Sequence, residues 1–284
     1  MHKKYSVRSS AWNYGGGNWK LSRSKIDLFT ECKRCFYLDN KLGVKRPSMP
    51  PFNLNVAVDS LLKQEFDLHR ARKSPHPLMS SYGLSAVPAQ HPQINEWREN
   101  FKGITYRHPV THFVVSGAID DLWLLDTGEY AVVDYKATAK AEEITELNDT
   151  WHDGYRRQME VYQWLLRRQG MNVSNTGYFV YCNGKADARA FDGRLEFDIR
   201  LIPYTGNDAW VEPILLDIHR TLTSETVPAS HPDCEFCGYR TVAGKMLQKL
   251  HVAIPENVSA SKIVTPKKAG RRKATPNAEV KTLF

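Results

Sequence analysis

Two aspartates and a lysine interrupt sequence that is otherwise apolar. Asp134 and Lys136 lie two residues apart at the end of the run Tyr130 to Tyr135, and Asp120 lies in the preceding run, Phe113 to Leu125. Carboxylates and ammonium groups are rarely buried unless they are paired or bound to metal. Magnesium prefers oxygen ligands, commonly one or two carboxylates together with substrate phosphate. These residues therefore predict a metal site in which Lys136 positions the attacking water or neutralises charge on a phosphate.

The two apolar runs predict the strands that bring these side chains together. Between the runs lies the polar segment Asp126 to Glu129, whose Gly128 suits a tight hairpin turn. Side chains two apart on a strand point to the same side, so Asp134 and Lys136 share a face that Asp120 reaches from the neighbouring strand. The competing interpretation is a salt-bridged strand pair without metal, because a single D-x-K pattern is common by chance.

Four of the five cysteines form two C-x-x-C pairs. Cys32 pairs with Cys35 and Cys234 with Cys237, whereas Cys182 stands alone in an apolar run where we expect an ordinary core residue. Cysteines three apart on a helix share a face and can chelate one metal. If the two pairs meet in space, the four thiolates suit either tetrahedral zinc or a four-iron cluster. Simple burial of four unrelated thiols is the alternative.

The remaining pattern predicts alternating helices and strands, which is an α/β chain. Residues 73–100, rich in His, Pro and Ser, are expected to form a connection with little regular structure, and 137–150 an exposed loop over the site. Apolar periodicity and capping residues predict these further elements: helices from Ser22 or Ser24 to about Gly43, from Asn53 or Asn55 to Arg72, from Asp153 to Gln169 and from Asp208 to Thr223, and strands at Thr176–Cys182 and Leu195–Leu201.

The charge of the chain is unevenly distributed. The formal net charge is +8 over 284 residues, but residues 257–284 carry seven Lys or Arg against Glu279, which leaves +2 for the rest. Long-range attraction to polyanions is therefore weak for the body, and phosphate contacts must come from local patches and the tail. No apolar run approaches the roughly 18 residues of a membrane span, and no signal peptide is evident, so we expect a cytoplasmic protein without membrane contact.

Six motifs occur in a fixed order over residues 21–240: LSRS, C-x-x-C-F-Y-L, G-A-I-D, V-V-D-Y-K, Q-M-E-V-Y and a late C-x-x-C. This order resembles the RecB-like branch of the PD-(D/E)xK nuclease superfamily, which includes bacterial recombination-repair nucleases and CRISPR adaptation nucleases that carry an iron-sulfur cluster. The resemblance implies a restriction-endonuclease-like fold, with a mixed central sheet flanked by helices and N- and C-terminal extensions tied together by the cysteines.

The resemblance also implies roles for particular residues. Asp120 and Asp134 match the metal-binding acids of the family, and Lys136 matches its catalytic lysine. Gln158 and Tyr162 match the Q-x-x-x-Y motif, which lies beside the site and contacts DNA.

The chain departs from the family pattern in two places. Where the family usually has a metal-binding His or Glu on the helix before the hairpin, this chain has Asp59, with Glu65 as the alternative ligand. The iron-sulfur relatives generally have one early cysteine and three late ones, whereas this chain has two of each. His231, three residues before Cys234, is a further candidate ligand.

The function implied by the resemblance is a magnesium- or manganese-dependent DNA nuclease, an exonuclease acting in repair, recombination or defence. Its partners would be single-stranded DNA or double-stranded ends, together with a helicase or repair protein, because the chain has no Walker A motif of its own. The expected organisation is an irregular segment at 1–20, the nuclease-like domain at 21–255 and a disordered basic tail at 256–284. A noncatalytic nucleic-acid-binding module and a nuclease acting on RNA are the alternatives, since fold does not imply function.

Overall fold

The computed structural model describes residues 6–48, 52–142 and 144–250, and the chain forms two compact units, one ending at Tyr239 and one beginning at Arg240. The helices are α1 (Arg23–Glu31), α2 (Lys33–Asn40), α3 (Asn53–Arg72), α4 (Pro77–Ser81), α5 (Ile94–Trp97), α6 (Asp153–Arg168), α7 (Val211–Thr223) and α8 (Glu235–Lys249), with short 3-10 helices η1 (Ser10–Trp12), η2 (Thr150–His152) and η3 (Asp208–Trp210). The strands are β1 (Leu21–Ser22), β2 (Ala86–Pro88), β3 (Ile104–Arg107), β4 (Val114–Gly117), β5 (Asp121–Leu125), β6 (Tyr130–Thr138), β7 (Thr176–Gly184) and β8 (Phe197–Thr205).

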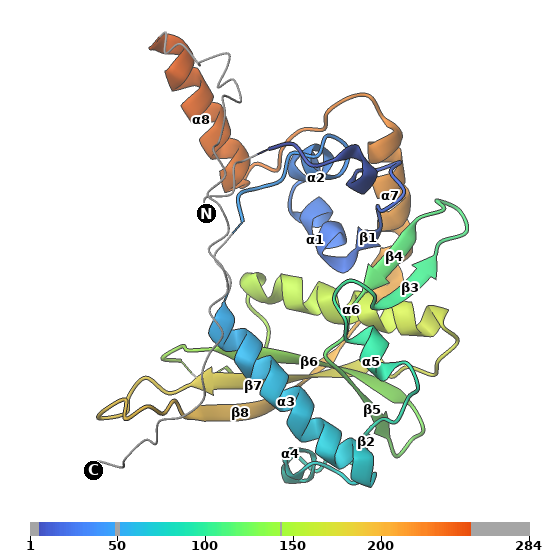
Figure 1. Ribbon diagram of the computed structural model, residues 1–284, viewed down its shortest axis with the longest axis vertical. Coiled ribbons are helices and arrows are strands. Elements are labelled where there is room, and N and C mark those ends of the chain that lie inside the picture. Colours follow the sequence, from blue (N-terminus) through green and yellow to red (C-terminus); the bar gives the residue numbers. More distant parts are fainter. Residues whose placement is uncertain (1–5, 49–51, 143, 251–284) are drawn as a thin grey trace, which may run out of the picture. The chain divides into compact units, whose positions relative to one another are not determined.

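The first unit is built on a mixed five-stranded sheet with the order β2-β5-β6-β7-β8 (Figure 1). Strands β6 and β7 run parallel, and the other neighbours are antiparallel. A second, three-stranded sheet has the order β1-β4-β3. The predicted mixed sheet flanked by helices is therefore confirmed.

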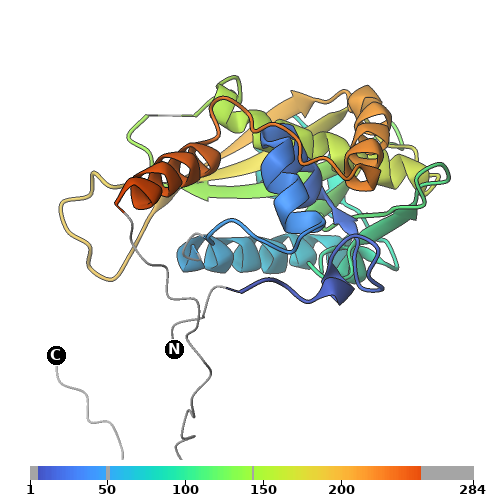
Figure 2. The ribbon, with the colours of Figure 1, turned by 90° about the horizontal axis from the view of Figure 1, so that it is seen from above.

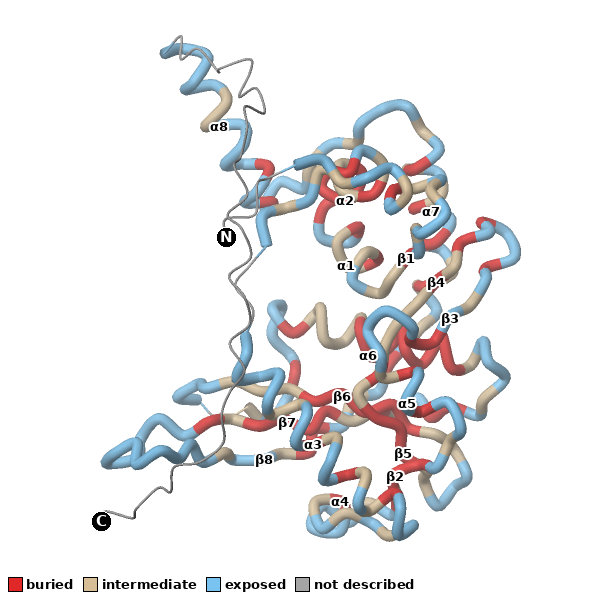
Figure 3. The backbone as a smooth tube through the Cα atoms, viewed as in Figure 1, coloured by how far each residue is buried: buried red, intermediate tan, exposed pale blue. Residues whose placement is uncertain are grey.

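Strand alternation gives the central sheet two buried faces, which α6 and α3 cover (Figures 1 and 2). Leu122 and Val132 pack toward α6, beyond which lie α1, α2 and α7, whereas Trp123 and Val133 pack toward α3. Figure 3 shows the buried residues concentrated along the central strands, in contrast to the largely exposed α8. The near-continuous apolar run of β6 follows from burial on both faces.

The first predicted helix is wrong, because it is two helices separated at Cys32. This residue has extended backbone angles, φ −163° and ψ 107°, between the end of α1 and the start of α2. The break turns the side chain of Cys32 toward Cys237, whose Sγ lies 3.9 Å from the Sγ of Cys32. Helical periodicity cannot predict a one-residue break that serves a contact 205 residues away.

Three other predictions of local structure need correction. Residues 73–100 contain α4, β2 and α5, elements too short to produce a periodic signal, and β2 pairs with β5. The first apolar run of the hairpin is divided between β4 and β5, which belong to different sheets. The strand predicted at Leu195–Leu201 is β8, which begins at Phe197 and ends at Thr205, and along it Leu201 is buried whereas Ile199 is 44% exposed.

The C-terminal part of the described chain is helical. Helix α8 has no counterpart among the predicted elements, since its apolar residues follow no clear helical stripe. The predicted basic tail at 256–284 lies outside the described residues. Among the described residues no helix is both long enough and apolar enough to cross a membrane.

Candidate active site and cysteine cluster

Asp120, Asp134 and Lys136 lie at one end of the β5–β6 pair. The antiparallel register, carried one step beyond the start of β5, places Asp120 beside Asp134. Asp120 Oδ2 accepts a hydrogen bond of 2.9 Å from the backbone N–H of Tyr135, which fixes its carboxylate against β6. Asp134 is fully buried, and its Oδ2 forms an ion pair with Nζ of Lys136.

Helix α6 brings Gln158 and Tyr162 to the same place. Gln158 Nε2 donates to Asp134 Oδ1 at 2.7 Å and to the Tyr162 hydroxyl at 3.1 Å, while Gln158 Oε1 accepts from Nζ of Lys136 at 3.3 Å. The amide therefore orients both the carboxylate and the ammonium group. Glycine at position 117 allows Tyr162 to pack closely against β4, because a Cβ atom there would lie 2.6 Å from Cε1 of Tyr162.

Helix α3 contributes Asp59 from the other side of Asp120. Nζ of Lys63 lies 2.9 Å from Asp59 Oδ2 and 3.4 Å from Asp120 Oδ1, so it bridges the two carboxylates. Glu65, the alternative ligand, is instead paired with His76 at 2.9 Å. The geometry therefore favours Asp59 over Glu65 as the contribution of α3.

The electrostatics of the three acids show their mutual repulsion. Burial raises the pKa of Asp134 to about 7, the charge of Lys136 opposes the rise and the carboxylate of Asp120 adds to it. Burial and the charge of Asp120 also raise the pKa of Asp59. Burial alone would lower the pKa of Lys136, but the carboxylates of Asp134 and Asp120 outweigh it and the net shift is upward.

These residues fit a divalent metal ion by the chemistry of their donors. Oxygen ligands from carboxylates are what magnesium and manganese prefer. Asp134 Oδ2 is buried, and its partner is the ammonium group of Lys136, which balances its charge. Lys63 balances Asp59 and Asp120 in the same way. In the described part of the chain, the carboxylate oxygens of the three acids are not all within 4.8 Å of one another. A divalent ion would supply the charge that the two lysines now provide.

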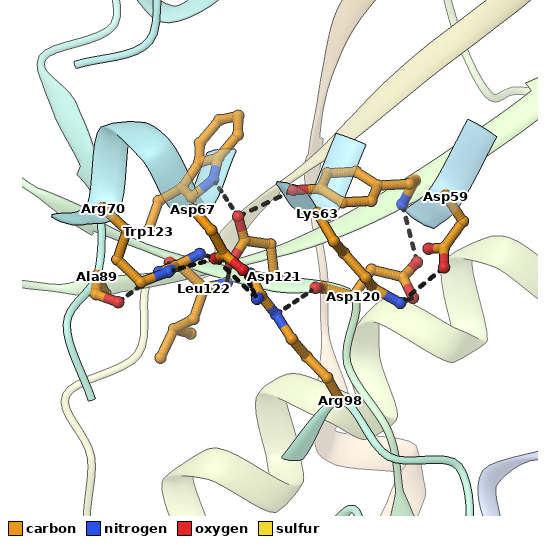
Figure 4. Close-up of polar contacts among 11 residues, drawn as sticks. Asp59, Lys63, Asp67, Arg70, Ala89, Arg98, Asp120, Asp121, Leu122 and Trp123 are labelled. Atoms are coloured by element: carbon orange, nitrogen blue, oxygen red, sulfur yellow. Dashed lines mark hydrogen bonds and ion pairs between the residues drawn. The ribbon is translucent and has the colours of Figure 1, made fainter. Parts of the chain in front are cut away.

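Sequence reasoning missed a group of charged residues beneath Asp120. Asp121 is fully buried and pairs with Arg70 and Arg98, and both arginines also contact Asp67 (Figure 4). The sequence does show that Asp67 follows Lys63 by four residues, which places the two side chains on the same face of α3. The contacts of Arg70 and Arg98 with Asp121 of β5 cannot be inferred from the sequence, because they join segments that are far apart along the chain.

The four cysteines of the two C-x-x-C pairs meet, with all four Sγ atoms within 4.8 Å of one another. The Sγ of Cys35 lies 3.6 Å from that of Cys234 and 3.5 Å from that of Cys237. A tetrahedral ion with Zn–S bonds of about 2.3 Å holds its sulfurs about 3.8 Å apart. The cluster ties the α1–α2 junction to the start of α8, as the resemblance implied.

Nearby donors favour the thiolate form of Cys32, whereas burial raises the pKa of Cys35 and of Cys237. Nη2 of Arg46 lies 3.7 Å from the Sγ of Cys234, and the backbone N–H of His231 donates to the Sγ of Cys32 at 3.5 Å. Burial acts to raise the pKa of Cys32, but hydrogen bonds from backbone N–H groups, including that of His231, lower it to about 6. The His231 ring faces Asp233 at 3.8 Å and is not part of the cluster. Cys182 is buried in the core.

The family model described as "PD-(D/E)XK nuclease superfamily" matches residues 20–242. A solved structure titled "Crystal structure of SSO0001" is similar, with 13% sequence identity, a TM-score of 0.33 and coverage of 84% of this chain and 87% of that chain. No match was found among curated proteins.

Proposed function

The chain belongs to the PD-(D/E)XK nuclease superfamily, and we propose that it hydrolyses phosphodiester bonds of DNA with the help of a divalent metal ion. The observation that carries this proposal is the convergence of Asp120, Asp134 and Lys136 at one end of β5 and β6. Packing does not explain three charged groups at the end of an apolar sheet, because hydrophobic side chains of similar size would avoid the cost of removing charges from water.

Each residue has a distinct part in the proposed reaction. Asp59, Asp120 and Asp134 would hold magnesium or manganese, which when bound makes water more acidic and stabilises charge on the phosphate. Lys136, released from its ion pair with Asp134, would donate to the attacking water or to a phosphate oxygen. Gln158 keeps Asp134 and Lys136 in place through its two hydrogen bonds.

The proposed substrate and pathway rest on the family resemblance. We propose DNA as the substrate, cut from single-stranded or double-stranded ends in repair, recombination or defence. A helicase or repair protein would supply strand separation. The resemblance assigns a DNA contact to Tyr162, but its side chain is 4% exposed and packed between Gln158 and Gly117, so we propose that Tyr162 supports Gln158 beside the scissile bond.

At the cysteines we infer a single tetrahedral ion, and zinc is the metal that suits it. The Sγ separations of 3.5, 3.6 and 3.9 Å support this because four thiolates on one ion share one centre. In a four-iron cluster each cysteine thiolate binds a different iron. The cysteine Sγ atoms would then be farther apart than around a single ion, because the irons themselves are separated.

Incubation of the purified protein with end-labelled DNA or RNA tests the nuclease proposal. Magnesium or manganese should support cleavage of DNA, and a chelator should stop it. Asp134→Asn, which removes a charge at nearly constant volume, should lower the rate at least about a hundredfold while the fold is kept, as expected for a principal electrostatic contribution. Preference for RNA would change the substrate, and tight DNA binding without cleavage under any metal would indicate a noncatalytic module instead.

A further inference from the structure

Arg98 joins the two elements that carry the proposed metal ligands. Its Nη1 donates to both carboxylate oxygens of Asp67 on α3, at 2.8 and 3.0 Å. Its Nε donates to the backbone carbonyl of Asp120 at 3.0 Å, and its Nη2 to the carboxylate of Asp121 at 2.7 Å. The guanidinium group therefore fixes the backbone at Asp120 directly against α3 (Figure 4).

The position of Asp67 on α3 connects this link to Asp59. Asp59, Lys63 and Asp67 are spaced by four residues, so they lie on one face of the helix, one turn above another. Holding Asp67 against the start of β5 thus sets how far Asp59 stands from Asp120. Lys63 spans that distance, with Nζ 2.9 Å from one carboxylate and 3.4 Å from the other.

Asp121 is fully buried, and its carboxylate accepts a hydrogen bond that holds Arg98 in place. Besides Arg98 it accepts hydrogen bonds from Nε1 of Trp123 at 3.2 Å, the hydroxyl of Tyr135 at 2.9 Å and the backbone N–H of Leu122 at 2.8 Å. A buried carboxylate that accepts this many hydrogen bonds is held rigidly in one orientation. Both carboxylate oxygens of Asp121 accept hydrogen bonds within this network. Of Asp120 and Asp121, Asp120 is therefore the acid that faces the site.

Arg70 provides an internal comparison. It contacts the same two acids as Arg98, with Nε 2.9 Å from Asp67 and Nη2 paired with Asp121. Its remaining donor, Nη1, donates to the carbonyls of Ala89 and Leu122. Among the described residues, Arg70 forms no hydrogen bond or ion pair with Asp120. The two arginines thus share the network but differ in their contact with the site.

We propose that Arg98 is a positioning residue that holds Asp120 at the separation from α3 at which Asp59 and Asp120 bind one divalent ion. The inference rests on the proposed metal-dependent function. Arg98 touches neither the ion nor the substrate and acts through the carbonyl of Asp120 and the side chain of Asp67. A lysine cannot replace it, because an ammonium group lacks the planar fork that reaches all three acceptors at once.

The test compares Arg98→Lys with Arg70→Lys in the full chain. Binding of Mn²⁺ is measured by titration calorimetry, with Asp134→Asn identifying the heat that belongs to the site, and thermal unfolding is measured in parallel. Loss of a residue that orients a metal ligand typically weakens metal affinity by about 10- to 100-fold, which is the expected result for Arg98→Lys. Arg70→Lys should lower the melting temperature but leave the affinity for Mn²⁺ close to that of the wild type. High Mn²⁺ should restore cleavage by Arg98→Lys.

The outcomes separate this inference from the proposed function. Equal loss of Mn²⁺ affinity in both variants, or unchanged affinity in Arg98→Lys, would overturn the positioning role while the nuclease proposal stands. A wild-type protein that binds no Mn²⁺ through Asp134 would overturn both. If Arg98→Lys does not fold, Asp67→Asn removes the charge that holds Arg98 to α3, and an unaltered affinity in that variant would also overturn the inference.

Discussion

Asp120 and Asp121 have the same side chain but opposite surroundings, and strand alternation is the cause. Asp121 points to the α3 face, where two arginines, a tyrosine and a tryptophan satisfy it. Asp120 precedes the strand and is half-buried beside Asp134. A shift of one residue in the register of β5 would exchange these environments, so the buried network also keeps Asp120 in the site.

The contribution of α3 to the metal site can be tested with two carboxylates on the same helix. We expect Asp59→Ala to raise the magnesium concentration that half-saturates cleavage, because it removes a ligand beside Asp120. Glu65→Ala should have little effect, since Glu65 pairs with His76 at the surface. A metal titration of both variants is the measurement, and a larger effect in Glu65→Ala would show that the ligand is assigned to the wrong turn of α3.

The raised pKa of Asp134 predicts how metal binding depends on pH. Its folded-state pKa of about 7 lies above the ordinary 3.8, so the buried carboxyl is protonated below pH 7 and must lose that proton to bind metal. Between pH 8 and pH 6 the affinity for Mn²⁺ should fall about tenfold, as one proton competes for the site. Calorimetry across this range checks the prediction, and an affinity independent of pH would contradict it.

The same shift affects stability without metal. A carboxyl whose pKa is higher in the folded state stabilises the fold at pH values below its unfolded pKa, and this contribution is lost as the pH rises from about 4 to about 7. Asp134→Asn should flatten that part of the stability profile, since the amide does not ionise. Denaturant unfolding of both proteins without metal measures the difference.

Local spacing made Asp120, Asp134 and Lys136 visible in the sequence, because a hairpin brings together residues that are close along the chain. Arg98 and Asp67 carry no such signal. They are 31 residues apart, and their meeting depends on how α3 packs against β5. Sequence periodicity describes one element at a time, so a residue that acts between elements becomes apparent only with the fold.

At the scale of elements, the break between α1 and α2 places the early cysteines for a shared site. Cys32 in extended conformation and Cys35 in the first turn of α2 point toward Cys237 at 3.9 and 3.5 Å. An unbroken helix would have kept both cysteines on its surface, three residues apart. The break therefore has a structural reason in the contact with the start of α8.

If one ion holds the four cysteines, they should behave as a unit. Each Cys→Ser change should cause the same loss of metal content and melting temperature, and combining two should add little, since members of one site are not independent. Cys182→Ser is the matched control, because this buried cysteine lies in a different cluster and should leave metal content unchanged.

Metal analysis after anaerobic purification identifies the occupant. Stoichiometric zinc in a colourless protein would support the tetrahedral ion. Iron with labile sulfide in a brown protein would instead show that the four cysteines hold an iron-sulfur cluster. Four titratable thiols in the folded, metal-free protein would contradict a shared site of either kind.

At the scale of the whole molecule, the cysteine cluster connects distant parts of the sequence. Cys32 and Cys237 are 205 residues apart, so an ion bound between them closes a long loop of chain. Because an ion that binds the folded protein and not the unfolded chain stabilises the fold, its removal should destabilise the first unit as a whole. Ends of the domain that are remote in sequence would then unfold together.

The charge distribution of the molecule leads to the last prediction. Residues 257–284 carry seven of the 39 lysines and arginines, and these cations lie outside the described residues. Cations in such a segment can contact phosphates without selecting sequence, and the release of counterions makes that binding steeply dependent on salt. Truncation after Ile254 should therefore weaken DNA binding at low salt and flatten the plot of log affinity against log salt concentration. Cleavage at saturating DNA should persist, because Asp120, Asp134 and Lys136 are retained. Binding measured by fluorescence anisotropy over a salt series decides the matter: an unchanged slope would assign the tail to solubility or to another partner.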